Sequence, residues 1–203
     1  MDDTNIIEIP EFFGYKIKTR YIIDADGIIV HSASNSKRDL FIAATSINAF
    51  RLGVKFARGY RFYIGRKYWM EIRYEEDKIL KISLSSYYGI KAKTYDEAWR
   101  SIFNLIWHHY APEVLNKYIN AFNEKKEFEM AGFNFETDGL RLNKDTKLLW
   151  KELSMSKYRS YFMIYQKGNP KIHRSCTFAI DWNAYVAQDL FEKIINENTK
   201  STD

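Results

Sequence analysis

Two stretches that begin 112 residues apart decide how this sequence folds: residues 21–30, YIIDADGIIV, and residues 133–142, FNFETDGLRL. Each has an acidic residue two places before an Asp-Gly pair, and apolar residues alternate around the pair. This pattern predicts a β-hairpin, because Asp and Gly both accept the positive φ of primed turns. Two hairpins at a long offset indicate either an internal repeat or two unrelated turns of a common kind.

The residues after the first hairpin favour the repeat. Side chains alternate between apolar and polar from Tyr68 to Tyr74, which predicts a strand with one buried face. Apolar residues then recur every three or four positions from Trp99 to Tyr110, which predicts an amphipathic helix. Thr94 and Glu97 have the spacing of a capping box at its start. Further strand-like runs cover residues 40–50, 60–64 and 78–84.

The second half follows the same plan over a shorter length. Asp181 is expected to cap a last helix whose apolar stripe runs from Trp182 to Ile194. Pro112 ends the first helix or begins the next. Strand-like runs cover residues 128–137, 140–143, 148–156, 161–167 and 171–178. We therefore expect an α+β protein with a first domain at residues 12–110, a helical connector at 111–127 and a second domain at 128–197.

The second half resembles small bacterial members of the pleckstrin-homology-like (PH-like) fold. The resemblance rests on the hairpin at 133–142, the pattern Trp-x-x-Leu from Trp150 to Leu153 as a third strand, and the helix after Asp181. The first half resembles the fold less closely, because it lacks that tryptophan and has a longer strand region. The resemblance implies two antiparallel β-rich barrels or curved sheets in tandem, each closed by a C-terminal amphipathic helix. It also implies a binding or scaffold role, although a shared fold does not assign a function.

Composition excludes several classes of protein. Of 203 residues, 46% are hydrophobic and 17% aromatic, with only 9 Gly and 3 Pro, which excludes a disordered or fibrous chain. A single cysteine, Cys176, excludes an internal disulfide and a multi-cysteine zinc site. Residues 1–5, MDDTN, carry two acids and lack the basic start of a secretory signal. No apolar run reaches the ~18 residues needed to span a membrane. We expect a soluble cytoplasmic protein.

Residues 51–73 are the stretch most suggestive of a function. They hold seven basic residues against one acid, Glu71, with aromatic residues between them, whereas the whole chain has a net charge of only +5. Basic side chains can neutralise phosphate groups, and neighbouring aromatic rings can stack on bases. The combination is typical of surfaces that bind anions or nucleic acids. A half-solvated β-ribbon, with arginine stems covering apolar surface, explains the same pattern. We expect 65–67 at a hairpin tip. The candidate binding residues are Arg58, Arg61, Arg66, Lys67, Trp69 and Arg73.

Residues that could carry catalysis are few. Asp24 and Asp26, repeated as Glu136 and Asp138, could bind Mg²⁺ or act as acid and base, but Asp before Gly is first a turn residue. His173 and Cys176 would face opposite sides of a strand, which argues against a nucleophile–base pair. We predict no catalytic residue, no metal and no cofactor.

Three functional hypotheses follow. The first is a non-enzymatic binding or scaffold module for a protein or peptide, an anionic ligand or a lipid head group, with self-association through edge strands possible. The second is nucleic-acid binding through residues 51–73. The third is a metal-dependent hydrolase or nuclease that uses Asp24 and Asp26.

Overall fold

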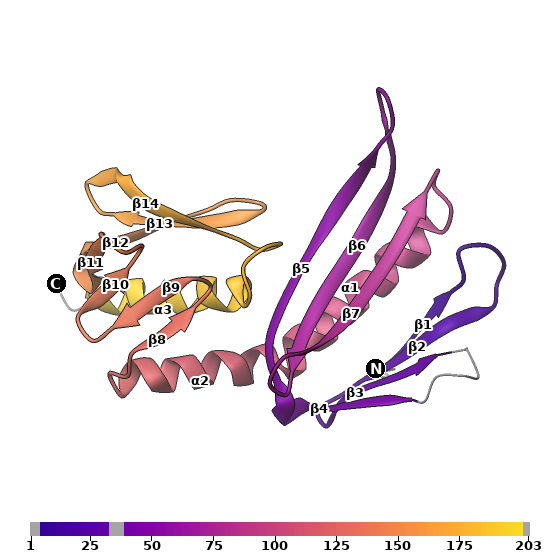
Figure 1. Cartoon of the computed structure of the whole chain (residues 1–203), viewed down its shortest axis with the longest axis horizontal. Coiled ribbons are helices and arrows are strands. Elements are labelled where there is room, and N and C mark those ends of the chain that lie inside the picture. Colours follow the sequence, from indigo (N-terminus) through magenta and orange to yellow (C-terminus); the bar gives the residue numbers. More distant parts are fainter. Residues whose placement is uncertain (1–4, 33–38, 201–203) are drawn as a thin grey trace. The chain divides into compact units, whose positions relative to one another are not determined.

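The computed structural model describes residues 5–32 and 39–200, with side chains described up to residue 197, and it divides the chain into two compact units (Figure 1). These units are Met1–Pro112 and Glu113–Asp203. Each unit combines antiparallel sheets with helices, so the α+β class is correct. Residues 1–4, which include the acidic Asp2 and Asp3, lie outside the described part of the chain.

Unit 1 contains seven strands and a helix that follows them. The first four strands form one sheet in the order β1-β2-β3-β4, and the next three form a second sheet in the order β5-β6-β7. The elements are β1 (Ile6–Pro10), β2 (Ile17–Ile23), β3 (Gly27–Ser32), β4 (Leu40–Ala43), the 3₁₀ helix η1 (Ala44–Ser46), β5 (Ile47–Arg58), β6 (Tyr63–Tyr74), β7 (Lys78–Tyr87) and α1 (Ala92–His109). Within the described residues both sheets are open, so the predicted barrel is not formed by hydrogen bonds.

The core of unit 1 lies between the sheets and α1. The predicted alternation on β6 is confirmed, because Tyr68, Met70 and Ile72 are all buried. The helix contacts β1 and β2 of one sheet and β7 of the other. At its last turn, the hydroxyl of the buried Tyr110 donates a hydrogen bond of 2.8 Å to the carbonyl oxygen of Asp24 in the β2–β3 turn. This bond ties the end of the helix to the hairpin that contains the first Asp-Gly pair.

The predicted capping box at Thr94 is wrong. Helix α1 already begins at Ala92, and its N-cap is Lys91, which has a left-handed backbone with φ of 53° and makes no side-chain cap. The reason lies in the preceding turn, in which Tyr88 and Gly89 also have positive φ. This turn directs the chain into the helix before Thr94 is reached.

Unit 2 has the same order of elements, with a four-stranded sheet, a 3₁₀ helix, a three-stranded sheet and a closing helix. Helix α2 (Ala111–Asn123) precedes the strands, and its Tyr118 and Phe122 contact Phe128 and Trp150. The other elements are β8 (Phe128–Met130), β9 (Phe133–Glu136), β10 (Gly139–Arg141), β11 (Lys147–Leu149), η2 (Trp150–Glu152), β12 (Leu153–Lys157), β13 (Tyr161–Gln166), β14 (Asn169–Thr177) and α3 (Ala184–Lys200).

Aromatic rings fill the core of unit 2. Phe191 on α3 is fully buried, and its ring centroid lies 5.1 Å from those of both Phe133 and Phe135 and 5.9 Å from that of Phe162. The helix therefore inserts one ring among rings from both sheets, which fixes how it covers them.

Three sequence-based assignments are wrong, two of them in unit 2 and one in unit 1. Trp150 lies in η2 and not in a strand, because the chain turns there from the first sheet to the second. The expected strand at 40–50 is interrupted by η1 in the same way. Asp181 does not cap α3, which begins at Ala184. Instead its carboxylate accepts a hydrogen bond of 2.6 Å from the Thr177 backbone N–H and closes the turn before the helix.

The two Asp-Gly glycines have the same surroundings in both units. A Cβ on Gly27 would overlap the carbonyl oxygen of Ile42, and a Cβ on Gly139 would overlap that of Leu148. The N–H that begins each 3₁₀ helix bonds to the residue before the glycine, Ala44 to Asp26 at 2.9 Å and Trp150 to Asp138 at 3.4 Å. A close approach of the next strand therefore requires glycine at both positions. Gly27 also has a positive φ of 157°, whereas Gly139 lacks the positive φ of a primed turn that we predicted.

Candidate functional site

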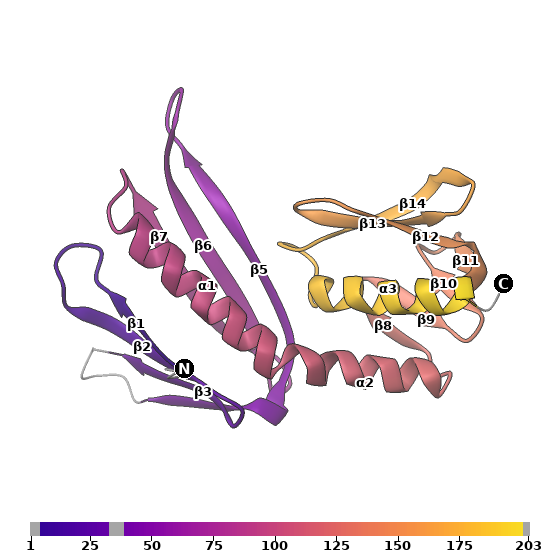
Figure 2. The same cartoon turned by 180° about the vertical axis from the view of Figure 1, so that it is seen from behind.

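The predicted binding residues lie on one long hairpin of unit 1, formed by β5 and β6. Each strand has twelve residues, and a turn at 59–62 closes with a 2.7 Å bond from the Gly59 N–H to the Phe62 carbonyl oxygen. Pairing of β6 with β7 ends at Gly65↔Tyr87, so residues 58–63 project beyond the three-stranded part (Figure 2). The projection carries Arg58 and Arg61.

The expected tip at Gly65-Arg66-Lys67 is wrong, since these residues lie within β6. The run expected as a strand at 60–64 is mostly the turn. Arginine and aromatic residues continue without a break from strand to turn to strand, so the local sequence gives no signal for the place of reversal. The chain reverses instead after Gly59, four residues before β6 begins at Tyr63.

The pleat of β6 separates the candidate residues into two groups. Arg66 shares its face with Tyr68, which is buried on the side of α1, while Lys67, Trp69 and Arg73 lie on the opposite face. The six candidates therefore do not form one site. They divide among the turn, the inner face that α1 partly covers, and the outer face of the sheet.

The outer face centres on Trp69, which lies between the small residues Gly53 and Ser83 on the neighbouring strands. The ammonium of Lys55 lies 5.6 Å from the Trp69 ring centroid, and the indole N–H is buried without a hydrogen-bond partner among the described residues. Lys67 pairs directly opposite Lys55 in the register. This face combines an aromatic ring with cations.

Glu71 is the acid of this outer face. Its carboxylate is 2.8 Å from the Arg51 guanidinium and 3.5 Å from the Lys81 ammonium. Burial alone would raise the pKa of Glu71, but the hydrogen bonds and charges of Arg51 and Lys81 outweigh burial and lower the pKa. Glu71 therefore stays ionised and offsets part of the positive charge of the face.

A groove of about 740 Å³ lies on the inner side of the same hairpin, between its outer half and the first turns of α1. Its lining mixes exposed rings with cations. The residues that line it are Phe56, Phe62, Tyr63, Ile64, Gly65, Arg66, Tyr68, Ser86, Tyr88, Gly89, Ala92, Lys93 and Asp96. Of the six sequence candidates, this groove contains only Arg66.

A polar chain fixes the floor of the groove. The Tyr68 hydroxyl donates a 2.9 Å hydrogen bond to Asp96, and the Arg100 guanidinium donates a second 2.9 Å bond to the same carboxylate. Burial, assisted by the charge of Asp96, raises the pKa of Tyr68. Asp96 is thus engaged within the protein, and Arg66 and Lys93 are the lining cations available to a ligand.

 The Lys93 ammonium lies 3.8 Å from the Glu97 carboxylate, one turn along α1. Arg66 forms no ion pair with a carboxylate among the described residues, and its side chain hydrogen-bonds to Tyr68. Both side chains of the Lys93–Glu97 pair are largely exposed, and exposed pairs of this kind are weak. Arg66 lies 5.8 Å from the Phe56 ring centroid. The groove therefore presents Arg66 as its main cation.

Sequence reasoning missed several residues of this region. Phe56, Asp96 and the exposed rings Phe13 and Tyr15 of the β1–β2 loop were not candidates. Phe56 was not a candidate because it continues the alternation of the buried residues Phe50 and Leu52, yet it is exposed. No feature of the local sequence gives the point at which a covering helix begins.

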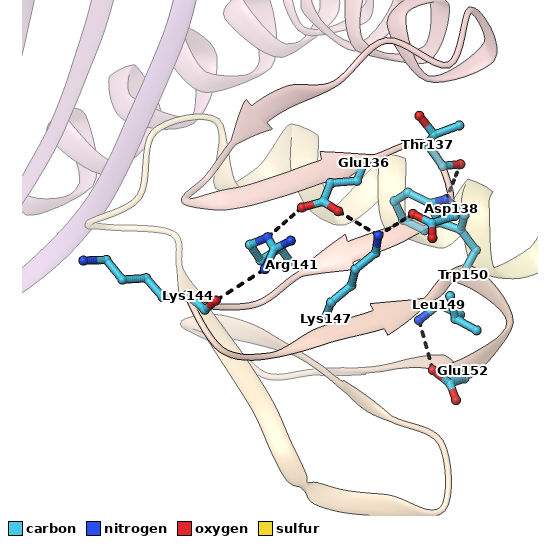
Figure 3. Close-up of polar contacts among 9 residues, drawn as sticks. All are labelled: Glu136, Thr137, Asp138, Arg141, Lys144, Lys147, Leu149, Trp150 and Glu152. Atoms are coloured by element: carbon cyan, nitrogen blue, oxygen red, sulfur yellow. Dashed lines mark hydrogen bonds and ion pairs between the residues drawn. The ribbon is translucent and has the colours of Figure 1, made fainter.

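The carboxylates considered for metal binding serve the turns. Asp24 accepts backbone N–H bonds from Asp26 at 2.9 Å and Gly27 at 3.1 Å. In unit 2, Glu136 contacts Arg141 and Lys147, and Lys147 also contacts Asp138 (Figure 3). In the described part of the chain no three His, Cys, Asp or Glu side chains gather as a metal site would require.

The ion pairs of Figure 3 change the acidity of these carboxylates. Hydrogen bonds from Lys147 and Arg141 lower the pKa of Glu136, and the Lys147 hydrogen bond lowers the pKa of Asp138. The same contacts raise the pKa of Lys147. The cluster is therefore fully ionised near neutral pH, and it holds β9, β10 and β11 together.

The cysteine and its neighbouring histidine are separated as predicted. Cys176 is fully buried, whereas His173 is exposed on the other face of β14. Burial, assisted by the charge of Asp181, raises the pKa of the Cys176 thiol. Cys176 is thus a core residue.

Comparison with protein-family models and with curated proteins found no match to this chain. No helix within the described residues is long and apolar enough to cross a membrane.

Proposed function

We propose that this chain is a non-enzymatic binding protein built from two PH-like units. The proposal is supported by the order of elements common to both units, in which four strands, a 3₁₀ helix, three strands and a closing helix follow one another. The matched glycines Gly27 and Gly139 support it further. A single cysteine suits a reducing compartment such as the cytoplasm.

One observation carries the proposed activity: β5 is a twelve-residue edge strand whose outer half runs beside the groove. An edge strand has backbone N–H and C=O groups that another strand can pair with. An extended peptide added to β5 would direct alternate side chains toward the groove. The bound ligand is therefore a segment of another protein in an extended conformation.

The lining of the groove defines the chemistry of that peptide. Rings of Phe56, Tyr63 and Tyr88 offer apolar contact, and Arg66 offers a cation that has no carboxylate partner among the described residues. We expect a peptide with an apolar or aromatic side chain for the groove and a carboxylate two residues away for Arg66, because residues two apart share a face of a strand.

Selection of a random displayed-peptide library on the full chain tests this proposal. We expect enriched peptides with alternating apolar and acidic residues, whose affinity falls about tenfold or more in a Phe56→Ser, Tyr63→Ser variant. Phe41→Ser is the matched control, since Phe41 is equally exposed, at 59% against 53% for Phe56, but lies on the other sheet of unit 1. Failure to enrich any peptide, or equal binding by the groove variant, would contradict the proposal.

Nucleic-acid binding is the second candidate, and the outer face with Trp69, Lys55 and Lys67 is the observation that favours it. Phosphate contacts would give an affinity that falls steeply with salt concentration. A Lys55→Gln, Lys67→Gln variant separates the two candidates, because neither residue lines the groove. It should weaken oligonucleotide binding and leave peptide binding unchanged.

A further inference from the structure

Exposed aromatic side chains gather in three connections of unit 1. Tyr15 is 96% exposed and Tyr60 is 89% exposed, values that are unusual for rings of this size. The three connections are the β1–β2 loop with Phe13 and Tyr15, the β5–β6 turn with Tyr60 and Phe62, and the β7–α1 turn with Tyr88. We call these five residues the aromatic rim.

Contacts between the connections make the rim one surface. The Phe12 ring of the β1–β2 loop contacts Tyr87 at the end of β7, with centroids 6.2 Å apart. The Lys91 ammonium donates a 2.5 Å hydrogen bond to the Gly14 carbonyl oxygen. Tyr88 lines the groove together with Phe62 and so links the β7–α1 turn to the β5–β6 turn. The five rings therefore border one end of unit 1.

The charge beside the rim is strongly positive. In the outer half of the β5–β6 hairpin, residues 54–67 contain five basic residues and no acidic residue. Cations also lie against the rim rings, with the Arg61 guanidinium 5.3 Å from the Tyr60 centroid and the Lys91 ammonium 5.2 Å from the Tyr15 centroid. The acid of the β1–β2 loop is Glu11, and the nearest acid of α1, Asp96, is bonded to Tyr68 and Arg100.

We infer that the aromatic rim docks on a membrane surface that contains anionic lipids. Tyrosine and phenylalanine rings insert at the level of the lipid head groups, and adjacent arginine and lysine side chains contact the phosphates there. The rings and the cations against them come from three separate connections of unit 1, and this spread suits a broad surface. A single nucleic-acid strand needs instead a continuous track of rings with free faces, and the faces of Tyr15 and Tyr60 already have cations against them.

Sedimentation of the full chain with vesicles tests the inference. The vesicles are phosphatidylcholine with about one-third phosphatidylglycerol, compared with phosphatidylcholine alone. We expect binding to the anionic vesicles, lowered about 25-fold by Arg58→Gln with Arg61→Gln, because each cation near an anionic surface contributes about fivefold. Tyr15→Ser with Tyr60→Ser should lower it about tenfold, since two rings no longer enter the interface.

Matched controls separate the surface from general charge and apolarity. Lys167→Gln with Lys171→Gln removes the same charge from exposed positions in unit 2, and Phe41→Ser with Tyr158→Ser removes two exposed rings elsewhere. Both controls should bind vesicles as the wild type does. None of the four substituted positions, Tyr15, Arg58, Tyr60 and Arg61, lines the groove. Peptide binding should therefore survive in both test variants, and the two proposals can fail independently.

Three results would overturn the inference. The first is no sedimentation with anionic vesicles. The second is an equal loss of binding in the control variants. The third is competition by a different ligand. Full competition by soluble glycerol phosphate would identify a free phosphate as the ligand. Tighter binding of a thymidine oligonucleotide, abolished by the same test variants, would identify a nucleic acid.

Discussion

Replacing Gly139 with alanine tests the close strand approach that both units share. The new Cβ would overlap the Leu148 carbonyl oxygen, and it would lie 3.0 Å from the Leu148 carbonyl carbon and 3.1 Å from the Leu149 Cα, where ordinary contacts are 3.4–4 Å. The obstructing atoms belong to the backbone, so no side-chain rotation relieves the overlap. Strand β11 must move away from β10.

The cost follows from what this movement disrupts. Pairing of β10 with β11 consists of three residue pairs, Gly139↔Leu149, Leu140↔Leu148 and Arg141↔Lys147. We expect the loss of about two hydrogen bonds, each contributing about 1 kcal/mol. Packing of the buried Leu140 and Leu148 also loosens, so the total destabilisation should be about 2–4 kcal/mol. Thr137→Ala, in the exposed turn of the same hairpin, should change stability by less than about 0.5 kcal/mol.

Urea unfolding followed by circular dichroism measures the difference. With a slope of about 1–2 kcal/mol per molar urea for a unit of this size, the midpoint of unit 2 should fall by about 1–4 M. Gly27→Ala should lower the midpoint of unit 1 in the same way, because its Cβ would overlap the Ile42 carbonyl oxygen. A Gly139→Ala protein as stable as the Thr137→Ala control would refute the close-approach explanation.

Three further predictions concern unit 2. Phe191→Ala should destabilise it by about 3–5 kcal/mol in the same urea experiment, because the fully buried ring contacts three others; a loss below about 1 kcal/mol would mean that the core closes over the gap. Cys176 should react with a thiol reagent only as unit 2 unfolds, because burial protects the thiol and raises its pKa; rapid labelling of the native chain would disprove the burial. Because the pKa values of Glu136 and Asp138 are lowered in the fold, the two carboxylates stabilise it above their ordinary pKa range. This stability is lost as the pH falls through the lowered pKa values. Urea midpoints between about pH 6 and about pH 2 should therefore fall less in Lys147→Met than in the wild type, and parallel curves would contradict the assignment.

Periodicity in the sequence predicted the interior well. The alternation from Tyr68 to Tyr74 and the helical stripe from Trp99 to Tyr110 both identify buried faces correctly, because burial acts on each residue through the local geometry of its element. Element ends were predicted less well. Thr94 and Asp181 have the chemistry of helix caps, but a left-handed turn and a backbone bond to Thr177 decide where the two helices begin.

The candidate site was predicted only in part. Residues 51–73 do contain the projecting hairpin, yet the pleat divides Arg66 from Lys67 and Trp69, and the groove depends on Tyr88 and Asp96 from later elements. These partners are brought to the hairpin by the second sheet and by α1, so their contribution depends on tertiary packing that a linear pattern does not contain.

The projecting end of the β5–β6 hairpin has a consequence for how this protein can change over evolutionary time. Residues 58–63 extend beyond the last pairing with β7, and Tyr60, Arg61 and Phe62 contribute little to the buried interior. Substitutions there alter the recognition surface at small cost to folding. New binding preferences can therefore arise at this turn by single mutations, while packing requirements constrain changes in the scaffold that presents it.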